Sequence, residues 1–503
     1  MSAITNHSDQ AGSINLHTKM TYGCGQAVDA IIQASVNTFL LFYLTSVCGF
    51  YGSAAGSIFL VSLVVDALLD PLIGRASDNW KSRWGRRLPF MTGAILPMTI
   101  AAYLMFNLPA GLSGTPLYIY VLGLNIILRV GLSVFALPHS ALTAELTDNY
   151  TERTSISTFR ALFIVIGTAA TLLPAFSWIF SRPDLLETRG AYSVFGMLIA
   201  ILIGAFGLTC ILGIFRRVVS LPIPTESGHD NISRVFLELL QLFRNPSFPP
   251  MFFGAVVVLI GQGVAYALNL HAFRYFWALP PAWIQLPLLM LPFGMLLGTA
   301  IGGLMMKRIE KRDGVIGAVL LLGAYQALSP LLIISGLVGP GTLASIVMAA
   351  TSGLLFGACG ALCFICFYSM IADAVDEHDL LFGIRREALY AAALMIGAKS
   401  ASGVGAFLAG FGLQAVGFPT QAADSDIVLL PEGVAENIGL LWGPGAAAII
   451  LVSVPLLLRY RITKTHHEGI LASLANRDTA ASLAPGKYAV LPTVVCRTTS
   501  IPE

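Results

Sequence analysis

Long apolar stretches alternate with short polar breaks along almost the whole chain. About twelve of these stretches reach the roughly 20 residues that an α-helix needs to cross the hydrocarbon core of a bilayer. They are residues 20–48, 52–75, 88–108, 116–142, 157–181, 190–215, 250–276, 283–306, 315–336, 342–370, 388–415 and 437–459. A longer polar stretch, residues 216–249, separates the sixth from the seventh. The pattern therefore predicts an all-α membrane protein with twelve transmembrane helices in two six-helix halves.

Lysine and arginine gather in alternate breaks between these stretches. One set of breaks holds most of them: Lys19, Arg75, Lys81, Arg83, Arg86, Arg87, Arg153, Arg216, Arg217, Arg234, Arg244, Lys307, Arg308, Lys311, Arg312, Arg385, Arg386, Arg459, Arg461 and Lys464. The other set holds Arg182, Arg189 and Arg274. Because short cytoplasmic loops are enriched in lysine and arginine, we expect both chain termini and the 216–249 stretch to be cytoplasmic.

This orientation divides the chain into five parts. Residues 1–19 are a cytoplasmic tail, 20–215 the first half, 216–249 a central cytoplasmic loop, 250–460 the second half and 461–503 a cytoplasmic C-terminal tail. Within the central loop, Ile232 to Phe243 is amphipathic and is expected to lie along the membrane surface. The tail from about Thr463 onward is polar on average and is expected to pack little.

The composition agrees with a membrane protein and excludes some functions. Of the 503 residues, 56% are hydrophobic and 11% are charged, whereas soluble domains carry roughly 25% charged residues. The net charge of +2 is too small to indicate nucleic-acid binding. Cys359, Cys363 and Cys366 share one helical face in an apolar stretch, and we interpret them as buried side chains rather than metal ligands. Neither a metal nor a cofactor is expected.

Two carboxylates, Asp66 and Asp70, lie near the end of the second apolar stretch. Acidic residues inside spanning helices are costly and are by default functional. Four residues apart, the two lie on one helix face, where they can together bind a small cation or hold a proton. The alternative is that they lie near the membrane surface and form a salt bridge with a neighbour.

Four longer motifs combine charged, glycine and proline residues between or at the ends of the apolar stretches. They are D-A-L-L-D-P-L-I-G from Asp66, S-R-W-G-R-R-L-P-F from Ser82, L-P-H-S-A-L-T-A-E-L-T-D-N-Y-T-E-R-T from Leu137 and Y-R-I-T-K-T-H-H-E-G-I from Tyr460. Together they resemble the glycoside-pentoside-hexuronide:cation symporters, the melibiose-carrier-like family of the major facilitator superfamily. The resemblance covers nearly the whole chain. It implies the major facilitator fold and a transporter that moves a small solute by alternating access, driven by H⁺, Na⁺ or Li⁺.

The resemblance also implies roles for single residues. Asp66 and Asp70 match the family's cation-site acids, and Ser133 falls where the family has a cation-ligating hydroxyl. Lys399, in I-G-A-K-S-A-S-G, falls on a lysine near the acids and the substrate. The alternative for Lys399 is that its side chain reaches to the cytoplasmic surface. For Ser133 it is a hydroxyl bonded to its own helix.

The residues that the family uses to recognise sugars are matched less completely in this chain. Arg160 falls near a family arginine associated with sugar recognition, with reach to the membrane surface as its alternative. Asp29 resembles a sugar-binding acid, but an ungapped alignment puts it one residue early, about 100° round the helix. The family's best-studied sugar transporters have an aspartate and a tryptophan where this chain has Ala136 and Ser140.

Other polar residues inside the spans are candidate substrate ligands: Arg129, His139, Gln262, Asn269 and His271. Arg129 needs an acid or an anionic ligand, so it either pairs with Asp29 or holds a carboxylate or phosphate of the substrate. His139 is either a protonatable ligand or a neutral histidine satisfied inside the bundle. For the remaining three residues the alternative is hydrogen bonding between helices.

Charged residues at the expected cytoplasmic helix ends are candidate gating residues, whose pairs would latch the outward-facing state. They are Asp78, Arg83, Arg86, Arg87, Glu145, Asp148, Glu152 and Arg153, with Asp373, Asp376, Glu377, Asp379, Arg385 and Arg386 in the second half. Anchoring of the topology explains most of them equally well.

These observations predict a cation-coupled symporter of a glycoside, sugar acid or related small polar solute, acting as a monomer in a bacterial inner membrane. The alternatives are a symporter of lysophospholipids or other amphiphiles or anions on the same fold, and a non-transporting membrane sensor. No catalytic pair indicates an enzyme. Because Leu69 stands where sodium-using relatives have an asparagine, we expect H⁺ to be cotransported in preference to Na⁺.

Overall fold

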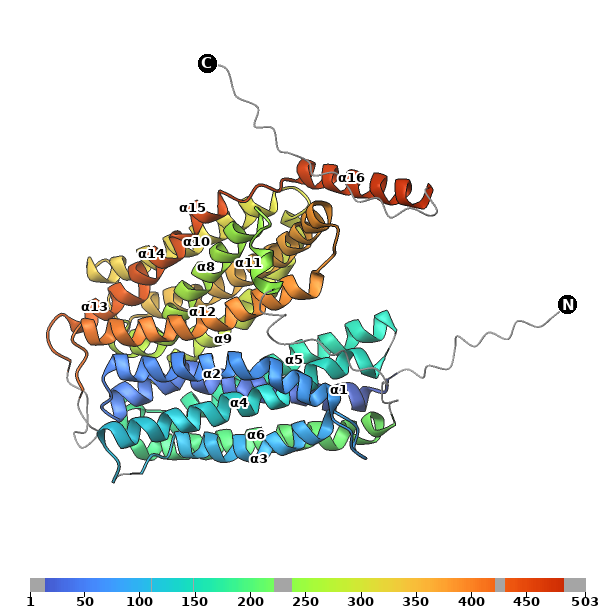
Figure 1. Cartoon of the computed structure of the whole chain (residues 1–503). Coiled ribbons are helices and arrows are strands. Elements are labelled where there is room, and N and C mark those ends of the chain that lie inside the picture. Colours follow the sequence, from blue (N-terminus) through green and yellow to red (C-terminus); the bar gives the residue numbers. More distant parts are fainter. Residues whose placement is uncertain (1–13, 110, 148, 221–237, 421–429, 484–503) are drawn as a thin grey trace, which may run out of the picture.

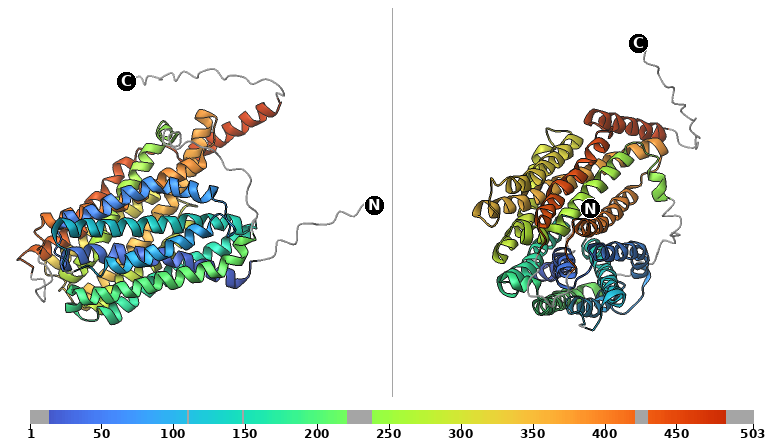
Figure 2. Two further views of the ribbon diagram at one scale, coloured as in Figure 1. Left: turned by 60° about the horizontal axis from the view of Figure 1, so that its bottom comes forward. Right: turned by 90° about the vertical axis from the view of Figure 1, so that its left-hand side faces the viewer.

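The protein is built from long helices that run side by side in two groups (Figure 1). The structure is a computed structural model and describes residues 14–109, 111–147, 149–220, 238–420 and 430–483. All regular elements of these residues are helices, as the sequence predicted. Figure 2 shows the two groups as separate halves of the bundle.

The first half contains six long helical runs. α1 is Leu16–Ser35 and continues through the π-helical turns η1, Val36–Leu40, and η2, Tyr43–Val47. It is followed by α2 (Gly52–Asn79), α3 (Leu88–Met105), α4 (Gly114–Leu146), α5 (Tyr150–Pro174) with η3 (Ala175–Ile179), the 3₁₀ turn η4 (Pro183–Glu187) and α6 (Arg189–Val219).

The second half repeats this organisation. Its elements are α8 (Phe248–His271) with η5 (Ala272–Phe276), α9 (Pro281–Met305), α10 (Lys311–Ile334), α11 (Leu343–Phe382), α12 (Glu387–Ala415) and the broken run α13 (Val434–Leu440), η6 (Leu441–Gly445), α14 (Ala446–Leu451) and α15 (Ser453–Leu457). A further helix, α16 (Lys464–Leu483), follows.

Eleven of the described helical runs are long and apolar enough to cross a membrane. The run from Leu16 to Val47 is not among them, although the sequence predicted its apolar part, 20–48, as the first span. It carries polar side chains along its length, including Lys19, Gln26 and Asp29. The structure confirms the all-helical membrane fold, and the count of twelve spans stays a prediction.

One helix is longer than its apolar pattern indicated. The expected span 342–370 is the first part of α11, which continues to Phe382. Its last turns carry Asp373, Asp376 and Asp379, so these acids lie on a helix and not in a loop. The helix ends where Gly383 adopts φ +72°, a left-handed conformation that glycine accepts most easily. The chain then turns into α12 after three more residues.

The two ends of the bundle differ in charge. We call the end at which α2, α4 and α11 finish the basic end, because the lysine and arginine clusters lie there. The opposite end is the one at which η2 finishes at Val47 and α2 begins at Gly52. In Figure 1 the ribbons of the two halves lie close together at the opposite end and diverge toward α16 at the basic end.

α2 and α12 make the main contact between the halves. Their backbones approach closely at the opposite end, where a Cβ atom on Gly410 would lie 3.0 Å from the Cα of Gly56. Small residues permit such an approach between membrane helices. Near this contact the backbone N–H of Ser53 donates to the side chain of Gln414, at 3.2 Å. The contact fixes the face of α2 that carries Asp66 against α12.

One expectation about the basic end is wrong for the described residues. The C-terminal tail does pack: on α16, Ile470 is buried and His467 Nε2 lies 2.9 Å from Asp376 Oδ2 of α11. The described part of the amphipathic segment packs on the second half, and its position along the membrane surface stays a prediction. Leu242 is fully buried there, and Glu238 pairs with Arg386 at 3.0 Å. Residues 232–237 of that segment lie outside the described residues.

Candidate functional site

Lys399 of α12 joins Asp66 and Asp70 of α2 in the middle of the bundle. Its ammonium Nζ lies 3.2 Å from Asp66 Oδ2 and also contacts Asp70 Oδ2. Asp66 is buried, and the Lys399 side chain is 34% exposed. The lysine is therefore paired with both acids and does not extend to a surface. Charges in low dielectric need such partners, since an unpaired buried charge is costly.

Ser133 completes the surroundings of Asp66. Its hydroxyl donates to Asp66 Oδ1 at 2.6 Å instead of bonding to its own helix. Asp70 Oδ1 is also buried and has no hydrogen-bond partner among the described residues. Carboxylate and hydroxyl oxygens are the ligands that a small hard cation uses. The three expected cation ligands, Asp66, Asp70 and Ser133, thus lie together, with one carboxylate oxygen unoccupied by protein donors.

Arg129 lies on α4 one turn before Ser133. Its Nε is buried and has no hydrogen-bond partner in the described part of the chain. The acid whose charge acts on it is Asp66. Asp29 instead accepts a hydrogen bond from Gln26 Nε2 at 2.9 Å and forms no ion pair with Arg129. The alternative in which Arg129 pairs with Asp29 is therefore wrong for this conformation.

A row of polar side chains follows one face of α1, and of these the sequence predicted only Asp29 as a site residue. Arg160 Nη2 and Nε donate to Gln26 Oε1, at 2.8 and 3.1 Å. Gln26 links Arg160 to Asp29, and farther along the helix Asn37 donates to Gln33 at 2.9 Å. The spacing 26, 29, 33, 37 is that of one helix face, so periodicity was the signal that could have found Gln26, Gln33 and Asn37.

A cavity of about 270 Å³ lies between the halves. Its polar lining is Asn37 of the first half with Gln262, Tyr266 and Ser402 of the second. Its apolar lining consists of Phe59, Leu259, Gly263, Ala267, Leu291, Phe356, Ala398 and Ala406. The sequence predicted Gln262 among these residues, and its side-chain Nε2 is buried without a partner in the described structure. The cavity offers amide, hydroxyl and aromatic groups, and among the described residues that line it the only ionisable side chain is that of Tyr266.

Three other expected substrate ligands lie elsewhere. His139 is buried in the first half, stacked on the Tyr22 ring at 4.2 Å with its Nε2 2.9 Å from the Tyr22 carbonyl oxygen. Asn269 Oδ1 accepts a hydrogen bond from Trp442 Nε1 at 2.8 Å. His271 is fully buried, with its Nε2 2.8 Å from Thr45 Oγ1. All three side chains are hydrogen-bonded inside the bundle, as the alternative to ligand binding predicted.

The expected gating residues of the first half form pairs within that half. Glu145 accepts from Arg86 at 2.7 Å and from Arg87 at 2.5 Å, and Arg87 also pairs with Asp78 at 2.9 Å. Separately, Arg153 Nε donates to the carbonyl of Thr147, Glu152 pairs with Lys19 at 2.8 Å, and the Arg83 guanidinium lies 6.0 Å from the Trp84 ring. Asp148 lies outside the described residues. None of these pairs latches one half to the other in this conformation.

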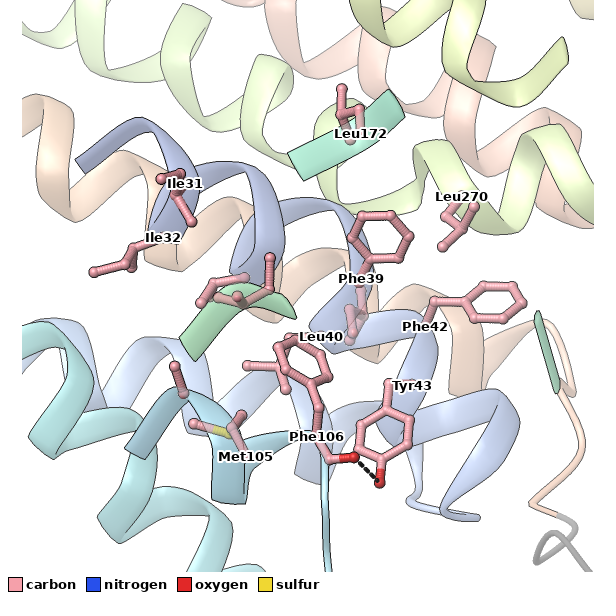
Figure 3. Packing of buried hydrophobic residues seen from close by; sticks show 14 of the residues in the cluster. Ile31, Ile32, Phe39, Leu40, Phe42, Tyr43, Met105, Phe106, Leu172 and Leu270 are labelled. Atoms are coloured by element: carbon pink, nitrogen blue, oxygen red, sulfur yellow. Dashed lines mark hydrogen bonds between the residues drawn. The ribbon is translucent and has the colours of Figure 1, made fainter. Parts of the chain in front are cut away.

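Contacts at the opposite end do cross between the halves. Arg274 Nε of η5 lies 3.1 Å from Glu187 Oε1 of η4, and the Glu187 side chain is 2% exposed. Phe42 of the first half contacts the His271 and Tyr275 rings of the second, at 4.9 and 5.7 Å between centroids. Figure 3 shows the Phe42 ring pointing away from Phe106. The opposite end is therefore closed by an ion pair and a layer of aromatic rings.

The chain is similar to known transporters along most of its length. The family described as MFS/sugar transport protein matches residues 21–464. An uncharacterized symporter of Synechocystis sp. is 26% identical and covers 93% of this chain and 98% of its own. The isoprimeverose transporter of Lactiplantibacillus pentosus is 24% identical and covers 83% and 84%. Among solved structures, the nucleoside transporter NupG aligns with a TM-score of 0.60 at 13% identity, covering 88% of this chain and 100% of its own, which supports the fold.

Proposed function

The chain belongs to the MFS/sugar transport protein family, and from this premise we propose that it couples the movement of a neutral glycoside, or a related small polar solute, to a cotransported cation. The family and its relatives are membrane transporters and not enzymes, so the protein is a multi-pass membrane transporter. The proposal adds the class of solute, the ion and the site of each.

The ion-paired cluster of Asp66, Asp70 and Lys399 joins the two halves beside a cavity that both halves line, and this arrangement is the main support for the proposal. Lys399 and the cavity residues Ala398 and Ser402 belong to the same turn of α12. Asp66 and the cavity residue Phe59 belong to α2. Cation binding that shifts α2 against α12 at the cluster would therefore also shift the cavity residues, because the same two helices carry both.

The cluster supports a simple coupling step. A cation that binds Asp66 and Asp70 competes with the Lys399 ammonium for the same oxygens. Because the acids belong to the first half and the lysine to the second, cation binding removes a contact between the halves. A ligand shifts a conformational equilibrium when it binds the two states differently, and this exchange provides such a difference.

The lining of the cavity favours an uncharged solute. Sugar hydroxyls form hydrogen bonds with amides and hydroxyls such as those of Asn37, Gln262 and Ser402, while sugar rings pack on aromatic faces such as Phe59. A uronate or a phosphate would need a cation, and none lines the cavity among the described residues. The name of the isoprimeverose transporter, a relative over 83% of this chain, agrees with a small glycoside.

For the ion, we propose H⁺ in preference to Na⁺. A sodium ion needs several oxygen ligands, and Leu69 supplies none from its side chain. A proton needs one carboxylate and no coordination shell. For the location, we propose a bacterial inner membrane with the basic end facing the cytoplasm, which makes the described conformation inward-facing. We propose that the monomer is the transporting unit, since the cavity and the cluster are complete within one chain.

The class of solute is tested by the thermal stability of the purified protein in detergent. Isoprimeverose, glucuronate and lysophosphatidylcholine serve as probes of a neutral glycoside, a sugar acid and a lysophospholipid. A ligand at 100 times its Kd adds about 2.7 kcal/mol to the stability of the folded state. We expect the neutral glycoside alone to raise the melting temperature. Stabilisation by lysophosphatidylcholine alone would establish the lipid alternative.

Transport itself is tested with right-side-out and inverted membrane vesicles. We expect a stabilising glycoside to accumulate under an imposed pH gradient. A solute that binds but is never transported would indicate a membrane sensor. Accumulation driven by a sodium gradient at constant pH, indifferent to a protonophore, would overturn the choice of ion.

A further inference from the structure

The charges around the acids on α2 balance within the protein. Asp66 and Asp70 contribute two negative charges, and Lys399 and Arg129 contribute two positive charges. The two cations differ in where they are attached. Lys399 belongs to α12 of the second half, whereas Arg129 belongs to α4 of the first half, as do the acids. Movement of one half against the other therefore separates Lys399 from the acids but leaves Arg129 beside them.

Two hydrogen bonds hold the Arg129 turn of α4 against α2. One turn before Arg129, Asn125 Nδ2 donates to Ser62 Oγ at 2.6 Å. One turn after it, Ser133 donates to Asp66 Oδ1 at 2.6 Å. Residues four apart share a helix face, so Arg129 lies on the face that meets α2, between these two bonds. This places Arg129 beside the cation site in the described conformation, and because both belong to the first half, it would stay there when the halves move.

Apart from its position beside Asp66, Arg129 makes none of the contacts that would explain a buried arginine. It does not line the cavity, it forms no ion pair with Asp29, and its buried Nε has no hydrogen-bond partner in the described part of the chain. The other arginine inside the first half, Arg160, is engaged with Gln26. A guanidinium group stays protonated under all conditions of interest, so its charge is fixed.

We propose that Arg129 excludes Na⁺ and Li⁺ from the Asp66–Asp70 site. When Lys399 leaves, the two acids and Arg129 carry a net charge of −1, and a metal ion that enters must approach the guanidinium as well as the carboxylates. Like charges a few ångströms apart repel strongly in a protein interior. The inference deepens the proposed function, on which it rests, by naming the residue that determines which cation is used.

The test is a titration of purified protein with NaCl and LiCl against choline chloride at constant ionic strength, followed by melting temperature. We expect no specific effect of Na⁺ or Li⁺ on the wild-type protein. Arg129→Gln should gain a saturable increase in melting temperature, half-maximal at an Na⁺ concentration at least roughly tenfold below the highest one at which wild type shows no effect. Arg129→Lys, which keeps the charge, should behave as wild type. Adding Ser133→Ala to Arg129→Gln should reduce the new sodium effect.

Arg160→Gln is the matched control, because it removes an intramembrane arginine that is bonded to Gln26 and not placed beside Asp66. It should gain no sodium effect. Specific stabilisation of the wild-type protein by Na⁺ would overturn the proposal even if Arg129→Gln failed to fold. So would a folded Arg129→Gln protein that remains indifferent to Na⁺ and Li⁺.

Failure of this inference is distinguishable from failure of the proposed function. The titration needs no solute, so it reports on Arg129 even if no glycoside is transported. If the glycoside accumulates under a pH gradient while Arg129→Gln shows no sodium binding, the protein is a proton symporter but Arg129 does not exclude Na⁺.

Discussion

Arg274 of η5 and Glu187 of η4 form an ion pair, 3.1 Å between Nε and Oε1, that ties the second half of the bundle to the first. Glu187 is almost completely buried. The pair therefore closes the opposite end in this conformation, and it must separate before a solute can enter the cavity from that side. Its removal should favour the state in which the opposite end is open.

The first prediction concerns this pair. Glu187→Gln removes the charge that Arg274 needs, and a loss of about 1.4 kcal/mol raises the open population about tenfold. Cys48, which lies between η2 and α2 and is buried, reports the opening. We expect its alkylation by N-ethylmaleimide, measured by mass spectrometry of its peptide, to speed up. Asp184→Asn is the control, since Asp184 pairs with Arg182 on the same exposed turn. Equal rates in both variants would contradict a latch at Glu187.

The second prediction concerns coupling. Asp66→Asn and Asp70→Asn should each abolish accumulation of the solute against its gradient, because the cotransported cation loses a ligand. Exchange of solute down its gradient should continue in the folded variants. The measurement is uptake into vesicles with and without an imposed ion gradient. Asp313→Asn, at an exposed acid of the basic end, should accumulate solute normally. Normal accumulation in both α2 variants would exclude these acids from the cation site.

The third prediction concerns Lys399. Lys399→Ala leaves the buried Asp66 and the partly buried Asp70 without their ammonium. Breaking a fully buried pair costs about 3–5 kcal/mol, and we expect about 2 kcal/mol here because the lysine side chain is 34% exposed. Chemical denaturation of the purified protein measures the loss. Combining Lys399→Ala with Asp70→Asn should recover part of it, since one uncompensated charge is removed. A double variant less stable than Lys399→Ala would argue against a pair between these residues.

The fourth prediction separates two amides of α8. Gln262 lines the cavity, whereas Asn269 is bonded to Trp442. Gln262→Ala should weaken binding of the glycoside about tenfold and leave the melting temperature within a few degrees of wild type. Asn269→Ala should lower the free energy of unfolding by about 1 kcal/mol and leave glycoside affinity unchanged. Ligand titration and thermal melting of both variants decide, and the reverse pattern would show that the cavity is not the binding site.

The fifth prediction concerns topology. Reporter fusions after Ser2 and at Glu503 should be cytoplasmic, and a fusion between Phe418 and Asn437 should lie on the other side of the membrane. The two terminal positions lie outside the described residues. A terminus on the far side would overturn the proposed orientation and the count of twelve spans.

The ion-paired cluster is the part of the site that the sequence predicted best. Asp66, Asp70 and Lys399 are charged residues inside apolar stretches, and each has few ways to avoid an unpaired charge in low dielectric. Because the apolar stretches contain few other charged residues, the sequence alone indicates that Lys399 pairs with Asp66 and Asp70. The helix positions are similarly well predicted, because spanning length and hydropathy determine them.

Neutral polar residues were predicted less well. A histidine or an amide inside a span can satisfy its hydrogen bonds from a neighbouring helix as easily as from a ligand, and its own sequence contains no sign of which. His139, Asn269 and His271 bond within the bundle, and Gln262 lines the cavity. Only packing between distant segments separates these cases.

The tail helix was missed for a related reason. The average polarity of residues 464–483 conceals Ile470 and Leu474, which are buried. It also conceals the partners on α11: Arg477 pairs with Asp379 at 3.0 Å, almost a hundred residues away in the chain. An average over a window cannot represent contacts of this range.

The close approach of α2 and α12 at Gly56 and Gly410 has a mechanical consequence. Their backbones come closest here, so the second half can rotate against the first about this contact. Lys399 lies eleven residues along α12 from Gly410, which is about 16 Å at the rise of an α-helix. A rotation of about 15° about this point therefore displaces the ammonium by about 4 Å, enough to break its contacts with the acids. A modest swing of one half would thus alternately cover and uncover the carboxylates, with no change in the shape of either helix.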